Sequence, residues 1–85
     1  MNIVVFQNED DRLYFAEYEK RDLIFSSGVE SMEEAIKKVD AIMKQRGFKL
    51  FGNPQGLNTR RIRAGKTIVV KKFLTYRPDK HAGHH

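Results

Sequence analysis

The sequence contains no cysteine, and its three histidines all lie in the final stretch 81–85. Without cysteine, the chain can form no disulfide, no thiolate metal site and no cysteine nucleophile. The ending His-Ala-Gly-His-His is typical of the start of a vector-encoded polyhistidine tag, so we expect these histidines to have no native role. Since the remaining chain lacks the most common nucleophile and the most common general base, we predict that the protein is not an enzyme.

Metal and cofactor sites also have little support in the sequence. Asp10 and Asp11 are adjacent acids that could hold a divalent cation, although such acids on a loop are usually only solvated. The stretch 52–56 contains two glycines and a proline, but it lacks the Gly-Lys-Ser/Thr ending of a phosphate-binding loop. We therefore expect no metal and no cofactor.

Long apolar runs are missing as well. No run approaches the roughly 18 residues that span a bilayer, and the N-terminus has no basic-then-apolar signal region. We expect a soluble, cytoplasmic protein without membrane association. The 85 residues predict one domain over 1–77, followed by a disordered tail over 78–85 that includes the tag remnant. Because so small a domain is marginally stable alone, we expect a homodimer.

Residues 31–47 predict an amphipathic helix. Ser31 can cap its first free N–H groups, and Glu34 stands three residues later, as in a capping box. Gly47 is suited to the left-handed conformation that ends a helix. Apolar residues recur at spacings of three and four and form one stripe: Met32, Ala35, Ile36, Val39, Ile42 and Met43.

Segments of strand composition lie on both sides of this helix. Polar or glycine-containing segments separate them, including an expected mobile loop over 52–59 and a turn at Gly65. The segments cover 3–7, 13–19, 23–26, 48–51, 60–63 and 67–76. Their order, ββ(β)αβββ, predicts an α+β fold in which the helix packs on one face of a small antiparallel β-sheet. In the last strand, alternation predicts that one face carries Ile68, Val70, Lys72, Leu74 and Tyr76.

Acidic residues are nearly absent from the second half of the chain. From Lys44 onward there are eleven basic residues and a single acid, Asp79, whereas Met1 to Met43 contains ten acids and five bases. This asymmetry indicates a polyanionic partner for the second half, or head-to-tail self-association. The alternative is a solvated basic surface that keeps the protein soluble.

The bases concentrate on a predicted hairpin over residues 60–72, here called the basic hairpin. A two-stranded ribbon matches the width of the DNA major groove, and it can also follow a single strand or an RNA. Phe73 and Tyr76 are candidate stacking surfaces beside it, as are Tyr14 and Tyr18, which otherwise simply cover the sheet. Edge strands also carry basic residues to prevent aggregation, so a structural explanation stays open. The candidate nucleic-acid-binding residues are Arg60, Arg61, Arg63, Lys66, Lys71 and Lys72.

A polar-tipped hairpin, a short strand and the stretch Gly-Val-Glu-Ser-Met-Glu-Glu-Ala-Ile at 28–36 resemble the N-terminal half of HicB-like antitoxins, over residues 2–43. That family's pattern has a glycine, a Ser/Thr cap, an acidic pair and Ala-Leu/Ile. The resemblance implies a partial RNase-H-like βββαβ fold and a small toxin RNase as partner. It also implies dimerisation and operator-DNA binding through a separate C-terminal part. The sequence departs from the family at 20–25, which lacks the Pro-Asp-Leu-Pro-Gly-Cys type of segment.

Two functions of different class follow from these patterns. The first is a small nucleic-acid-binding or regulatory module that binds DNA or RNA through the basic hairpin. The second is a protein-interaction module, antitoxin-like or a phage accessory protein, that binds a protein partner through its sheet edges. In the second case the acidic first half, including Glu9, Asp10 and Asp11, would engage a basic partner.

Overall fold

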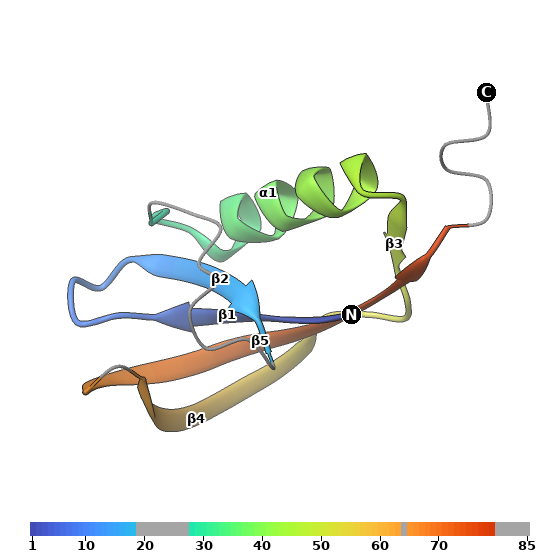
Figure 1. Ribbon diagram of the computed structural model, residues 1–85. Coiled ribbons are helices and arrows are strands. Elements are labelled where there is room, and N and C mark those ends of the chain that lie inside the picture. The colour runs from blue at the N-terminus through green and yellow to red at the C-terminus, as the bar shows by residue number, and fades with distance from the viewer. Residues whose placement is uncertain (19–27, 64, 80–85) are drawn as a thin grey trace.

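The computed structural model describes residues 1–18, 28–63 and 65–79. In this part of the chain one α-helix lies against one face of a curled antiparallel sheet (Figure 1). The elements are β1 (Asn2–Gln7), β2 (Leu13–Glu17), α1 (Met32–Gln45), β3 (Phe48–Leu50), β4 (Gln55–Arg63) and β5 (Lys66–Pro78). The predicted α+β class is confirmed. The short strand expected over 23–26 lies outside the described residues.

Strand β5 is the element to which the rest of the sheet is attached. β1 pairs with one edge of β5 and carries β2 on its own far side. β3 and β4 both pair with the opposite edge of β5, β3 near residue 77 and β4 along 66–73. β5 continues to Pro78, and the Asp79 N–H donates to the Gly47 carbonyl at 2.8 Å. The sheet region therefore extends slightly past the domain boundary expected at 77.

The helix begins and ends as its sequence predicts. The Ser31 hydroxyl oxygen accepts a hydrogen bond from the Glu34 N–H at 3.1 Å, and Gly47 has a φ of 83° just after the last turn. Each acid of α1 forms an ion pair with the lysine one turn later: Glu33 with Lys37, Glu34 with Lys38 and Asp40 with Lys44. The charges of α1 thus balance one another and contribute no net charge.

Apolar side chains are buried on both faces of the sheet. The larger cluster lies between α1 and the sheet, where Val39 and Met43 of the helix pack over Val5 and Phe15. A second cluster lies on the face away from α1 and comprises Val4, Phe6, Ala16, Ile68 and Val70. Burial of this apolar surface is the main source of stability for the fold.

A β-bulge makes β5 contribute to both clusters. Val5 of β1 lies opposite Lys72, but the next residue, Phe6, lies opposite Val70, so Lys71 is an extra residue in β5. Side chains on either side of the bulge therefore point to different faces. Ile68 and Val70 pack away from α1, whereas Leu74 and Tyr76 pack against it. The prediction that one face of the last strand carries all of these residues is wrong.

The loop expected over 52–59 is shorter than predicted. β4 begins at Gln55, which lies opposite Phe73, and Gly56 lies opposite Lys72. The register then shifts between Gly56 and Thr59, so this part of β4 is irregular but paired. Glycine, proline and asparagine favour turns locally, but pairing with a long neighbouring strand outweighs that preference here.

Tyr76 places a hydroxyl group beneath the helix. Its side chain is 0 % exposed, and its hydroxyl donates to Asp40 Oδ1 at 3.5 Å. Burial, together with the negative charge of Asp40 and this hydrogen bond, raises the pKa of Tyr76 to about 12. The neutral phenol is therefore the form that the folded protein favours.

This raised pKa predicts a loss of stability in alkali. An unfolded tyrosine ionises near pH 10, so the stabilisation by Tyr76 is complete below that pH and is lost as the pH rises toward about 12. Urea unfolding of the wild type between these pH values should show the decline. Tyr76→Phe cannot ionise, so its free energy of unfolding should fall less over the same range. Equal declines in both proteins would contradict the prediction.

Candidate nucleic-acid interface

The positive charge of the protein is concentrated on three strands. The described strands contain a single acid, Glu17 on β2. Their eight basic residues all lie on β3, β4 and β5: Lys49, Arg60, Arg61, Arg63, Lys66, Lys71, Lys72 and Arg77. Because the charges of α1 balance one another, this half of the sheet holds the excess positive charge of the described chain.

The basic hairpin is formed by the last residues of β4, the turn and the first half of β5. Gly65, with a φ of 76°, lies at its turn, and Arg63 lies opposite Lys66 at its end. Residues 55–62 of β4 are all exposed, and the outer edge of β4 pairs with no described strand. The hairpin is therefore an open ribbon at the margin of the fold (Figure 1).

The structure divides the six predicted residues into two groups. The group near the turn comprises Arg60, Arg61, Arg63 and Lys66. Arg60 lies opposite Val69 and Arg61 lies opposite Ile68, and both of these arginines are exposed. Because neighbouring residues of a strand point to opposite faces, the Arg60 and Arg61 side chains lie on opposite faces of the ribbon. Lys71 and Lys72 lie farther along β5, at the bulge.

The two bulge lysines lie over β4 rather than near the turn. Lys71 Nζ donates to Asn58 Oδ1 at 3.4 Å. Lys72 Nζ lies 3.7 Å from the position that a Cβ atom would occupy at Gly56. Both side chains are half-buried. They can add to the positive field of the ribbon, but they do not form one cluster with the arginines.

Most of the candidate stacking residues pack against other side chains of the sheet. Tyr76 is fully buried, so its predicted role as a stacking surface is wrong. Phe73 is half-buried and meets the Tyr18 ring edge-on, with 5.5 Å between ring centroids. Tyr14 stacks on Phe6 at 5.9 Å. Of these aromatic residues only Tyr18, at 48 % exposed, presents much surface to solvent.

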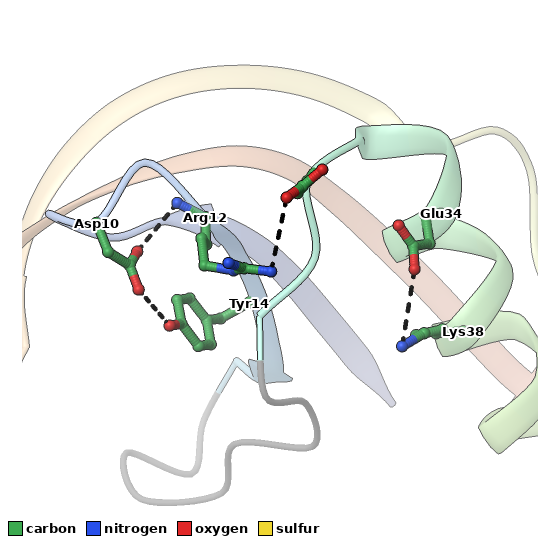
Figure 2. A network of polar contacts seen from close by, with 6 residues as sticks. Asp10, Arg12, Tyr14, Glu34 and Lys38 are labelled. Atoms are coloured by element: carbon green, nitrogen blue, oxygen red, sulfur yellow. Dashed lines mark hydrogen bonds and ion pairs between the residues drawn. The ribbon is translucent and has the colours of Figure 1, made fainter.

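The acidic tip of the β1–β2 hairpin is held by hydrogen bonds (Figure 2). The Tyr14 hydroxyl donates to Asp10 Oδ2 at 2.5 Å, and the Arg12 N–H donates to Asp10 Oδ1 at 3.0 Å. The bond from Tyr14, followed by that from Arg12, lowers the pKa of Asp10, and the same bond raises the pKa of Tyr14. Arg12 also pairs with Glu30 at 3.9 Å. Asp10 therefore stabilises this turn by accepting hydrogen bonds from two residues of the same hairpin.

Metal binding gains no support from this geometry. Among residues 1–18, 28–63 and 65–79, no three His, Cys, Asp or Glu side chains gather as metal ligands would. Both carboxylate oxygens of Asp10 already accept hydrogen bonds.

No known family matches. The chain matches no family model, no curated protein and no solved structure. The resemblance to HicB-like antitoxins thus stays a prediction. The one helix of the described chain is too short and too polar to cross a membrane.

A second basic site, which the sequence patterns did not single out, lies at the β3 end of the same sheet edge. Lys49 of β3 lies directly opposite Arg77 of β5, and the Arg77 guanidinium carbon is 3.6 Å from the centroid of the Phe51 ring. The sequence did contain a signal for this site, the alternation in Phe-Lys-Leu-Phe at 48–51. It places Phe48 and Leu50 on one face of the strand and Lys49 and Phe51 on the other.

Proposed function

We propose that the protein is a small nucleic-acid-binding module that binds through the basic hairpin. The observation that carries this proposal is the concentration of exposed bases on strands that contain almost no acid. Neither Arg60 nor Arg61 forms an ion pair with an acid among the described residues. Such a surface attracts phosphates without having to break internal ion pairs first.

The ribbon geometry suits a nucleic-acid backbone. A two-stranded antiparallel ribbon fits the major groove of B-form DNA, which is about 12 Å wide. Arg60 and Arg61 point to opposite faces of the ribbon, so they can reach phosphates on both walls of a groove. Phosphate contacts dominate such binding and carry no sequence information by themselves.

Titration at two salt concentrations tests this proposal. The protein without its histidine tail is added to labelled duplex DNA, single-stranded DNA and RNA, and fluorescence anisotropy is recorded at about 50 and about 200 mM salt. For two to five phosphate contacts, duplex affinity should fall about 10- to 500-fold between these concentrations. Flat titrations at both salts would contradict nucleic-acid binding.

A protein partner is the second candidate, supported by the unpaired outer edge of β4. Ile62, on this edge strand, is 81 % exposed. Exposed edges of this kind accept an additional strand from another chain. A second copy of β4 would bring arginines of both chains together, so an acidic strand is the better match. If the titrations showed no nucleic-acid binding, a protein partner would become the better-supported function.

A further inference from the structure

The second basic site lies on the face of the sheet away from α1. Phe48, Leu50 and Tyr76 all pack in the cluster under the helix. Lys49 and Arg77 alternate with these residues and are exposed, so their side chains point the other way. Two like charges directly opposite each other across a strand pair are destabilising. An anion bound between Lys49 and Arg77 would relieve this repulsion.

Phe51 and Arg77 form a stacked pair at this site. The guanidinium carbon of Arg77 lies 3.6 Å from the centroid of the Phe51 ring, as in a cation–π contact. The Phe51 N–H donates to the Thr75 carbonyl at 2.8 Å, which fixes the backbone beneath the ring. The Phe51 side chain is nevertheless 52 % exposed. Aromatic rings and guanidinium planes are the surfaces on which proteins stack unpaired bases.

This pair lies on the same sheet edge as the hairpin arginines. β3 and β4 both pair with one edge of β5, so Lys49, Phe51 and Arg61 follow one another along it. Arg61 lies at the level of Ile68 and Lys49 at the level of Arg77, nine residues farther along β5. At about 3.3 Å per residue this distance is about 30 Å. One extended polyanion can therefore contact both ends.

We propose that Phe51 and Arg77 form a base-stacking platform for single-stranded nucleic acid, with Lys49 as a phosphate contact. The proposal rests on the nucleic-acid binding proposed for the basic hairpin and adds the class of polymer. A duplex keeps its bases stacked inside and cannot offer them to Phe51, whereas a single strand can turn a base onto the ring. DNA and RNA single strands share this chemistry.

Phe51→Trp gives a direct test, because the chain contains no tryptophan. The variant is titrated with oligo(dT), oligo(rU) and a duplex, each about 12 nucleotides long, with fluorescence and anisotropy read together. Saturating single strands should quench the tryptophan emission, and the duplex should not. The DNA and RNA arms show which single strand is preferred.

Two substitutions separate stacking from charge. Phe51→Ala should weaken single-strand binding about tenfold and leave its salt dependence unchanged. Arg77→Lys keeps the charge but loses the planar group, so it should also weaken single-strand binding without changing the salt dependence. Leu57→Ala, which shortens another exposed apolar side chain on this edge, serves as the control and should bind as the wild type does.

The outcomes distinguish this inference from the proposed function. If Phe51→Trp bound single strands by anisotropy without quenching of its tryptophan emission, the platform would be overturned and the hairpin function would stand. Unchanged single-strand affinity in Phe51→Ala would do the same. Absence of binding to any polymer would overturn both. Circular dichroism of each variant checks that the fold is retained.

Discussion

Replacing Arg60 and Arg61 together by alanine is expected to weaken duplex DNA binding about 200-fold at 50 mM salt and about 20-fold at 200 mM. Each phosphate contact contributes about 0.9 to the slope of log affinity against log salt, so the slope should fall by about 1.8. Both side chains are exposed and lie outside the buried clusters, so the fold should be retained. Anisotropy titrations across salt concentrations measure both quantities.

A matched control removes the same amount of charge from the helix. Lys37→Ala with Lys38→Ala also deletes two positive charges, but these lysines are paired with Glu33 and Glu34 on α1. The control should keep a wild-type salt slope. If the helix variant lost as much affinity as the hairpin variant, binding would depend on net charge and not on the ribbon. An arginine variant with wild-type affinity would rule out the hairpin as the binding surface.

Deleting Lys71 is expected to preserve cooperative folding, because Lys71 is the extra residue of the bulge. After the deletion Val70 directly precedes Lys72, so Phe6 and Val5 keep their partners. Regular alternation then turns Ile68 and Val70 away from α1 and turns Leu74 and Tyr76 toward it. No large buried side chain is lost from the core, where each such loss would cost about 2–5 kcal/mol. Urea and thermal denaturation followed by circular dichroism should still show one cooperative transition.

Lys71→Ala is the control for the deletion. It keeps the bulge residue and removes only the side chain, whose Nζ donates to Asn58. Its free energy of unfolding should lie within about 0.5 kcal/mol of the wild type. A deletion variant without a cooperative transition would contradict this register and would mean that the fold requires the extra residue.

The helix was predictable because its signals are local. Ser31 and Gly47 mark its two ends, and the apolar stripe between them needs no knowledge of the rest of the fold. The two faces of β5 were not predictable in the same way. Alternation over residues 68–76 is regular in the sequence, and the bulge exists only because Val5 and Phe6 pair with that strand.

The candidate site was likewise only partly predictable. The sequence shows the density of arginines at 60–63 directly. It does not show that Tyr76 is buried, because that depends on where α1 lies. The contact between Phe51 and Arg77 joins residues far apart in the chain and follows from the pairing of β3 with β5. Interactions set by tertiary register leave little trace in a single sequence.

The central position of β5 also determines when the protein can fold. β1 is made first, yet Asn2 pairs with Thr75, 73 residues later, so the middle of the sheet cannot close until β5 has left the ribosome. Closing so large a loop is entropically costly, and pairings of this separation are typical of domains that fold in about milliseconds to seconds. Until then the β1–β2 hairpin and α1 expose the apolar faces that β5 later covers. Folding is therefore completed after translation of the strand, and not progressively from the first residue.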